Sequence, residues 1–124
     1  MRILGLGVDL ADIGRVETVM EKFPRFAQRC FTEGERAYAA RFARPARRFA
    51  ARFAGKEAVM KSLGRGWRQI RWTDVEITGG GPPKVVLRGS AAARAAQLGV
   101  TEVLVTITHT DDTALVMAVA VGEH

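Results

Sequence analysis

Two acidic residues far apart in the sequence, Asp9 and Glu57, have the surroundings expected of metal ligands. Asp9 lies near the end of the short apolar run ILGLGVDL, which predicts a buried strand that leaves this carboxylate few solvating neighbours. Glu57 lies in a helical segment, with Lys61 one turn later on the same side. Magnesium usually takes carboxylates from separate elements and completes its shell with water and phosphate oxygens, while a lysine neutralises remaining phosphate charge. The combination suggests chemistry on a diphosphate.

The helix that carries Glu57 also allows a less specific interpretation. With residues placed about 100° apart from Phe49 onward, Lys56 falls near 340°, within the apolar arc that contains Phe53. Glu57 falls at about 80°, at the margin of this arc, and Lys61 at about 120°. Lys56 could therefore extend its stem along apolar surface, and Glu57 with Lys61 could form an ordinary surface ion pair. The helical pattern alone leaves both interpretations open.

Local signals mark the helices that must hold these residues. Asp12 is a suitable N-cap for the helical segment IGRVETVMEKF, which a proline ends. Thr32, with Glu35 three residues later, gives the capping-box pattern at the start of FTEGERAYAARFA. The longest helix is expected from about Pro45 to Leu63, with Gly64 as its left-handed cap.

The second half of the chain has the pattern of two β-hairpins separated by a helix. WTDVEIT and KVVLRG predict strands around the loop GGGPP, and SAAARAAQLG predicts a helix with Ser90 as N-cap and Gly99 as its stop. TEVLVTITHT and TALVMAVAVG form the second hairpin. Residues Ala114 to Val121 are all apolar, which predicts burial on both faces, inside the domain or against another subunit. We expect an α+β fold in one domain, residues 1–124, with a long helix packed on an antiparallel sheet.

The composition limits the possible partners and compartments. Nineteen Lys and Arg against thirteen Asp and Glu give a net charge of +6, which attracts nucleic acid, an acidic protein, a phosphorylated cofactor or an anionic membrane. One cysteine and two histidines supply neither an internal disulfide nor the usual tetrahedral zinc site. Asp9 interrupts the N-terminal apolar run before it reaches signal-peptide or membrane-spanning length, so we expect a soluble, cytoplasmic protein that binds no membrane.

Two other classes of protein fit the sequence less well. A nucleic-acid-binding module should place its arginines beside exposed aromatic residues, whereas the phenylalanines here mostly have core spacing and no such binding signature is present. An interaction subunit that has lost catalysis would have no need of both Asp9 and Glu57. Self-association remains worth testing, because a domain of this size buries only part of its surface on folding.

Three motifs, in order and at matching spacing, resemble signatures of the holo-acyl-carrier-protein synthases. They are GLGVDLADIGRV, FAARFAGKEAVMKSLGRG and WTDVEITGGGPPKVVLRG, and together the resemblance covers nearly the whole chain. It implies the phosphopantetheinyl transferase fold and an enzyme that moves the 4'-phosphopantetheine arm of coenzyme A to a serine of apo acyl carrier protein. It further implies that adenosine 3',5'-bisphosphate is released and that the modified carrier serves fatty acid biosynthesis. The resemblance also implies a homotrimer, with coenzyme A in clefts between protomers.

The resemblance assigns the central roles to the two acidic residues. The family's aspartate and glutamate of the first and second motifs bind magnesium, and these positions are Asp9 and Glu57 here, which we expect to be catalytic. Lys61, aligned with Glu57, is our candidate for a phosphate contact. The serine proton could pass to Glu57 or to a metal-bound water. Further candidates for cofactor binding are Gly64 and Gly66, whose backbone could approach the nucleotide closely, and the side chains of Arg52 and Lys56.

The segment TITH, which ends at His109, resembles a Ser-x-Ser-His stretch that lines the cofactor cleft in the family. Here Thr106 and Thr108 replace both serines, so the hydroxyl groups remain while the fine geometry differs. His109 is therefore either a cofactor contact or a structural hydrogen-bonding residue on a strand.

A basic helix is the candidate docking surface for the carrier protein, which is strongly acidic in this family. Arg15 and Lys22 lie on the first helix and Arg25 just beyond it, with Met20 and Phe26 as candidate apolar contacts. The same charges would also suit a solvated helix face. Docking by opposite charges should weaken as the salt concentration rises.

Overall fold

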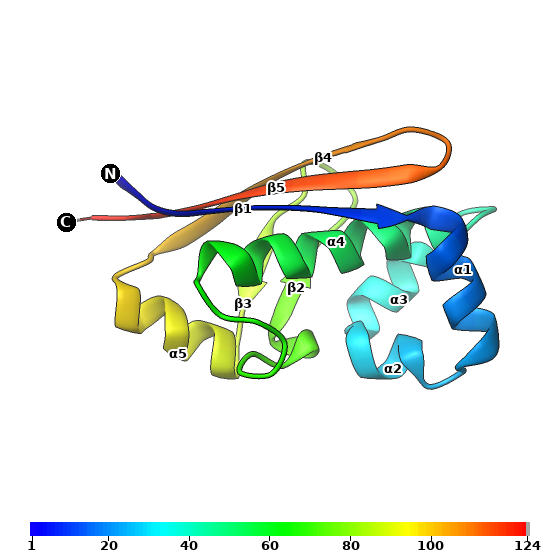
Figure 1. Ribbon diagram of the computed structural model, residues 1–124, viewed down its shortest axis with the longest axis horizontal. Coiled ribbons are helices and arrows are strands. Elements are labelled where there is room, and N and C mark those ends of the chain that lie inside the picture. The colour runs from blue at the N-terminus through cyan, green and yellow to red at the C-terminus, as the bar shows by residue number, and fades with distance from the viewer. Residues whose placement is uncertain (124) are drawn as a thin grey trace.

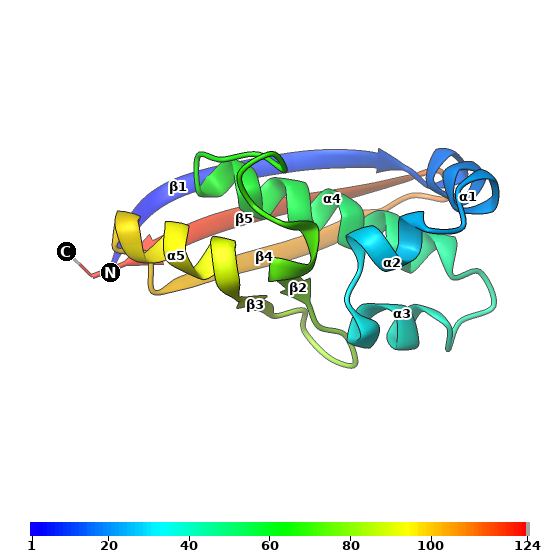
Figure 2. The ribbon, with the colours of Figure 1, turned by 90° about the horizontal axis from the view of Figure 1, so that it is seen from below.

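The computed structural model describes residues 1–123 and places a long helix, α4, between two layers (Figure 1). The elements are β1 (Arg2–Asp12), α1 (Ile13–Lys22), α2 (Phe26–Cys30), α3 (Glu33–Ala39), α4 (Ala46–Ser62), a 3₁₀ turn (Trp72–Asp74), β2 (Val75–Ile77), β3 (Val85–Leu87), α5 (Gly89–Leu98), β4 (Glu102–His109) and β5 (Thr113–Gly122). An antiparallel sheet in the order β1-β5-β4 covers one side of α4, and the β2–β3 hairpin lies on the other. Helices α1 to α3 gather at one end of α4 and α5 at the other (Figure 2). The α+β class, with an antiparallel sheet and a long helix packed on it, is confirmed.

Strand β1 packs against α4 with almost no side chain between the two backbones. A Cβ atom on Gly5 would lie 1.9 Å from the carbonyl oxygen of Ser62, and one on Gly7 would lie 1.9 Å from that of Ala58. Only glycine fits at these two positions. Because side chains alternate along a strand, Asp9 faces the helix as these glycines do. The glycines therefore set the short distance across which Asp9 approaches α4.

Helix α4 is buried on nearly all sides because both layers pack on it. It begins after Pro45 and ends in a turn where Gly64 has a φ of 69°. The N–H groups of Gly64 and Arg65 donate to the carbonyls of Lys61 and Met60, which satisfies the end of the helix. The expected length and left-handed cap are confirmed. The two-sided packing also places polar residues of this helix in the interior.

The outer face of the three-stranded sheet is apolar and exposed. Leu6, Val8 and Leu10 on β1 keep 59%, 52% and 60% of their surface accessible, and Met117 on β5 keeps 42%. β1 is therefore an edge strand with one open face, and the expectation of a buried strand is wrong for that face. Alternate residues of β5 such as Val116 are fully buried, so this chain covers only one face of β5.

Two helix starts follow the expected local chemistry and one does not. The Asp12 carboxylate accepts from the N–H of Arg15 at 2.8 Å, and Thr32 forms both halves of its capping box. The prediction of Ser90 as a cap is wrong, because its N–H and hydroxyl donate to Asp74 at 2.8 and 2.6 Å instead. Helix α2 is not indicated by any sequence pattern above, and the first residues of WTDVEIT form a 3₁₀ turn in place of the expected strand.

Candidate active site

The side chains of Asp9 and Glu57 meet where β1 crosses α4. The carboxyl group of Asp9 is close enough to that of Glu57 to disfavour its ionisation. The pKa of Glu57 is raised to about 7, first by partial burial and then by the neighbouring carboxyl group of Asp9, while the charge of Lys61 acts in the opposite direction. Two like charges have thus been brought together at a partly desolvated position, which is unfavourable unless a proton or a cation joins them.

Lys61 provides the positive charge nearest to this pair. Its Nζ atom lies 3.1 Å from Oδ1 of Asp9 and 3.1 Å from the carbonyl oxygen of Val8. The Lys61 side chain is 55% exposed, whereas that of Asp9 is 18% exposed. We call Asp9, Glu57 and Lys61 the acidic cluster. With both carboxylates ionised, one ammonium group leaves it with a net negative charge.

The donor set of the acidic cluster fits a hard divalent cation. Two carboxylates from separate elements face each other, and within residues 1–123 no further His, Cys, Asp or Glu completes a group of three. Magnesium is commonly held by one or two carboxylates, with water and substrate phosphates as the remaining ligands. Asp9 and Glu57 are therefore the residues that would hold Mg²⁺ in this chain.

Gly64 and Gly66 lie just beyond the end of α4, about one turn after Lys61. Both are exposed. The N–H of Gly64 already donates to the carbonyl of Lys61, and that of Gly66 donates to the side chain of Gln69 at 3.2 Å. Both glycines thus follow the acidic cluster closely in sequence, and their N–H groups already donate hydrogen bonds within the turn.

A second group of polar residues surrounds a cavity of about 420 Å³ between α4, β4 and the loop after β2. Arg52 and His109, both expected from the sequence, line it together with Arg47 and Arg48. Nη2 of Arg47 lies 3.2 Å from Nδ1 of His109. We call Arg47, Arg52 and His109 the basic cluster. Arg47 is not among the residues expected from the sequence, although it belongs to the arginine-rich run ARPARR.

The arginines of the basic cluster have unused hydrogen-bonding capacity. Arg52 donates from Nη2 to the carbonyl of Thr78 at 3.0 Å, and its guanidinium lies 4.8 Å from the ring centre of Tyr38. Its burial lowers its pKa. The Nε atoms of Arg47 and Arg52 are buried and have no hydrogen-bond partner within the described residues. Such donors suit an anionic ligand with several acceptor oxygens.

The acidic and basic clusters lie at opposite edges of the three-stranded sheet. Asp9 belongs to β1 and His109 to β4, and β5 lies between these strands. Helix α4 contributes to both edges, with Glu57 beside β1 and Arg52 beside β4. The structure therefore brings the predicted residues together in two separate groups, and within a single chain these groups do not form one site.

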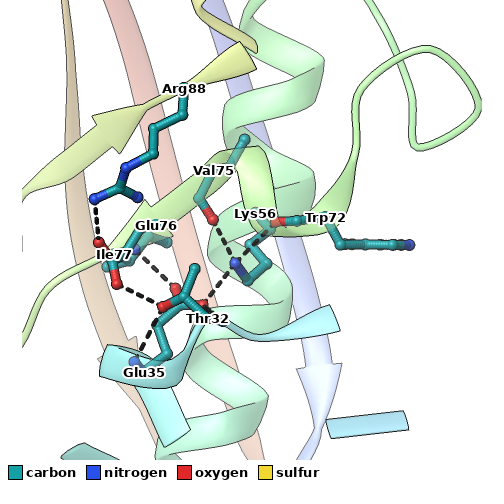
Figure 3. Close-up of polar contacts among 8 residues, drawn as sticks. All are labelled: Thr32, Glu35, Lys56, Trp72, Val75, Glu76, Ile77 and Arg88. Carbon is teal, nitrogen blue, oxygen red and sulfur yellow. Dashed lines mark hydrogen bonds and ion pairs between the residues drawn. The ribbon is translucent and has the colours of Figure 1, made fainter. Parts of the chain in front are cut away.

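Lys56 belongs to neither cluster, and its assignment as a cofactor contact is wrong. The side chain is fully buried, so it neither extends to the surface nor faces a cleft. Its Nζ atom lies 2.7 Å from Oε1 of Glu35 and donates to the carbonyls of Trp72 and Val75 (Figure 3). The helical pattern placed Lys56 correctly among apolar residues but did not identify Glu35 as its buried partner.

The three candidate docking residues are all exposed. Arg15 lines a hollow of about 280 Å³ that also involves Phe26 and Phe53. Lys22 lies in the last turn of α1, and Arg25 borders a separate hollow. None of the three basic side chains forms an ion pair with a carboxylate of residues 1–123. They remain free to meet the charges of a partner.

No helix within residues 1–123 has the length and apolar character needed to span a bilayer.

Comparisons with known proteins agree along nearly the whole chain. The family model described as the 4'-phosphopantetheinyl transferase superfamily matches residues 5–120. A holo-[acyl-carrier-protein] synthase of Desulforudis audaxviator is 46% identical over 123 residues, which cover 97% of this chain and 94% of that protein. The structure is also similar to that of the Plasmodium yoelii acyl carrier protein synthase with ADP bound, with a TM-score of 0.91, 28% identity and coverage of 99% and 98% of the two chains.

A second solved structure is a holo-(acyl-carrier-protein) synthase from Bacillus anthracis in complex with CoA (3',5'-ADP). It has a TM-score of 0.80 and 27% identity, and the match covers 98% of each chain. The match to the family model, the identity with the curated relative and the shared architecture lead to one assignment. This chain belongs to the 4'-phosphopantetheinyl transferase superfamily, and within it to the holo-[acyl-carrier-protein] synthases.

Proposed function

We propose that this chain transfers 4'-phosphopantetheine from coenzyme A to a serine of apo acyl carrier protein in a Mg²⁺-dependent reaction that releases adenosine 3',5'-bisphosphate. The observation that carries the proposal is the meeting of Asp9 and Glu57 at a partly buried position. Such a pair favours a cation, and the transferred group of coenzyme A is attached through a diphosphate. We place the reaction in the cytoplasm and assign the carrier protein to fatty acid biosynthesis.

Each residue of the acidic cluster has a separate role in the proposed phosphoryl transfer. Mg²⁺ held there would polarise the diphosphate and stabilise charge on the leaving oxygen. Lys61, more exposed than its partner Asp9, can turn its ammonium group toward a phosphate oxygen. The proton of the attacking serine would pass to Glu57 or to a water molecule held beside it, since both lie where the serine must approach the diphosphate. The serine attacks phosphorus directly, so the enzyme needs no covalent intermediate.

The basic cluster supports coenzyme A as the donor. Its cavity presents Arg47, Arg52 and His109, a donor set that suits a phosphate monoester such as the 3'-phosphate of the nucleotide. The Bacillus anthracis relative is in complex with CoA (3',5'-ADP), and the Plasmodium yoelii relative has ADP bound. In this assignment the nucleotide end lies at the basic cluster and the diphosphate at the acidic cluster.

The position of the two clusters at opposite edges of the sheet supports assembly of several copies. A single coenzyme A that contacts both edges of the sheet would lie between the β1 edge of one chain and the β4 edge of another. The exposed apolar side chains of Leu6, Val8, Leu10 and Met117 offer a surface that a second copy could bury. We propose a homotrimer, in which each cleft has the same composition. Light scattering should give three times the chain mass, and a monomer at micromolar concentration would contradict this assembly.

The carrier protein would dock near α1. Arg15, Lys22 and Arg25 carry no carboxylate partner within residues 1–123, and Arg15 borders a partly apolar hollow. An acidic helical protein would supply the missing charges, and its association should slow as the salt concentration rises.

The decisive experiment is a transfer assay followed by mass spectrometry of the carrier. Purified protein, coenzyme A, Mg²⁺ and an apo carrier of fatty acid biosynthesis should give a carrier heavier by one phosphopantetheine group, and a chelator should stop the gain. The same assay with an apo carrier protein of secondary metabolism shows which carriers the enzyme accepts. If the carrier mass does not change while a known holo-acyl-carrier-protein synthase modifies the same preparation, the proposed function is wrong.

A further inference from the structure

A buried polar network lies where α4 packs against α3 and β2, and it takes no part in the proposed chemistry (Figure 3). At its centre, Lys56 and Glu35 form an ion pair with both side chains fully buried. Lys56 also donates to the carbonyls of Trp72 and Val75, which precede and begin β2. One ammonium group thus links three elements to α4: α3, the 3₁₀ turn and β2.

The network is complete within the chain. The three N–H bonds of Lys56 have three oxygen acceptors. Glu35 accepts from the N–H of Thr32 at 2.9 Å with one oxygen and from the N–H of Ile77 at 2.8 Å with the other. A buried ion pair of this kind usually contributes little more stability than apolar residues of the same volume would. Its directional contacts instead select one arrangement of the elements that it joins.

The opposite side of α4 has contacts of a different kind. Gly5 and Gly7 of β1 lie directly on the carbonyls of Ser62 and Ala58. These contacts limit how close the strand and the helix can come, but smooth surfaces of small residues do little to fix the rotation of the helix about its own axis. Lys56 is the residue immediately before Glu57, and its hydrogen bonds have defined directions.

We propose that Lys56 is a positioning residue, which with Glu35 fixes the rotation of α4 so that the carboxylate of Glu57 faces Asp9. This inference rests on the proposed function of Asp9 and Glu57 as metal ligands. It gives the buried pair a role in metal affinity and in the rate of transfer, separate from its effect on stability. A small rotation at Lys56 would move the Glu57 oxygens away from the shared position, and misplacement by about 1 Å can reduce a rate up to a hundredfold.

The test compares a variant that removes the buried pair with one that removes a neighbouring pair. Lys56→Met/Glu35→Gln keeps the interior filled and leaves no unpaired buried charge. The matched control is Arg88→Met/Glu76→Gln, because Arg88 and Glu76 form an ion pair of 3.0 Å on the same hairpin, and neither side chain contacts α4 by a hydrogen bond. The measurements are Mn²⁺ affinity by electron paramagnetic resonance and single-turnover transfer, both on protein shown to be folded by circular dichroism.

For folded Lys56→Met/Glu35→Gln we expect the Mn²⁺ dissociation constant and the transfer rate each to worsen by about tenfold or more, while the control stays within about twofold of wild type. Folded protein with wild-type Mn²⁺ affinity and rate would overturn the positioning role. If the double variant does not fold, Glu35→Gln alone, which keeps the two carbonyl contacts of Lys56, must show a smaller loss of the same kind, and an unchanged Mn²⁺ affinity there would also overturn it. Wild-type protein that binds no Mn²⁺ would instead overturn the proposed function itself.

Discussion

Two consecutive residues of α4 take part in ionisable pairs of opposite kinds. Lys56 meets an opposite charge, Glu35, at 2.7 Å in a fully buried position where every polar atom has a partner. Glu57 meets a like charge, Asp9, at a position that is only partly buried. The first pair is satisfied within the chain and joins its elements together. The second becomes favourable only when something is added, which is the property expected of a binding site.

The largest effect is expected from breaking the like-charged pair. Asp9→Ala and Glu57→Ala should each slow transfer by about 1,000-fold or more, because each removes a proposed ligand of the cation that would stabilise the transition state. The fold should persist, because neither change removes core volume. Mass spectrometry of the carrier gives the rate, thermal melting checks the fold, and Asp111→Ala in the exposed β4–β5 turn is the control. A double variant with full activity cannot be reconciled with this site.

Breaking the buried ion pair of Lys56 and Glu35 should mainly lower the stability of the fold. Lys56→Met alone leaves the Glu35 carboxylate buried without its cation and should lower the free energy of unfolding by about 3–5 kcal/mol. The double change Lys56→Met/Glu35→Gln should cost less than the single one, because no buried charge remains. Urea unfolding measures both. If the two changes are additive, Lys56 and Glu35 do not interact in the way described.

Gly7→Ala should disturb the acidic cluster through the distance between β1 and α4. The added methyl group would lie 1.9 Å from the carbonyl oxygen of Ala58. Either β1 and α4 must move apart, or the backbone at this position must be strained. We expect a stability loss of about 1–3 kcal/mol and weaker Mn²⁺ binding in the folded protein. Gly14→Ala is the matched control, because its new atom would meet only a side-chain oxygen of Asp12 at an ordinary 3.5 Å. Equal Mn²⁺ affinity in both variants would refute the role of Gly7.

The smallest effect concerns pH. The pKa of Glu57 is about 7 in the folded protein and 4.5 ordinarily, so between these values the folded state holds a proton that the unfolded state has lost. In a metal-free buffer, this group should therefore make the protein less stable as the pH rises from about 4.5 to about 7. Melting temperatures of wild type and Glu57→Gln, measured across this pH range, test this prediction: wild type should lose stability with rising pH relative to the variant. If the melting temperatures of the two proteins change in parallel with pH, Glu57 does not titrate in this way.

Much of the local structure could be predicted from the sequence because its signals are local. The cap at Asp12, the capping box at Thr32 and the turn at Gly64 depend on residues within one helical turn, and all three are confirmed. The acidic cluster was also anticipated, since Asp9 and Glu57 were expected to converge, and the structure brings them together.

The features that the sequence did not reveal depend on contacts between distant segments. Burial of Lys56 needed Glu35, which is twenty-one residues earlier in the chain and also serves a capping box. Arg47 reaches His109 only because α4 passes under β4. The open face of β1 could not be told from a buried one, because its residues, such as Leu6, are apolar on the exposed side as well.

Because β1 packs directly on α4, the arrangement of the acidic cluster is sensitive to the number of residues in β1. Gly5, Gly7 and Asp9 share one face of the strand because they are two residues apart. Deleting or inserting one residue between Gly7 and Asp9 would turn the aspartate to the outside and direct a leucine or valine at the helix. Laboratory evolution of this enzyme should therefore accept exchanges of residue type along the outer face of β1 far more readily than any change in the number of residues within it.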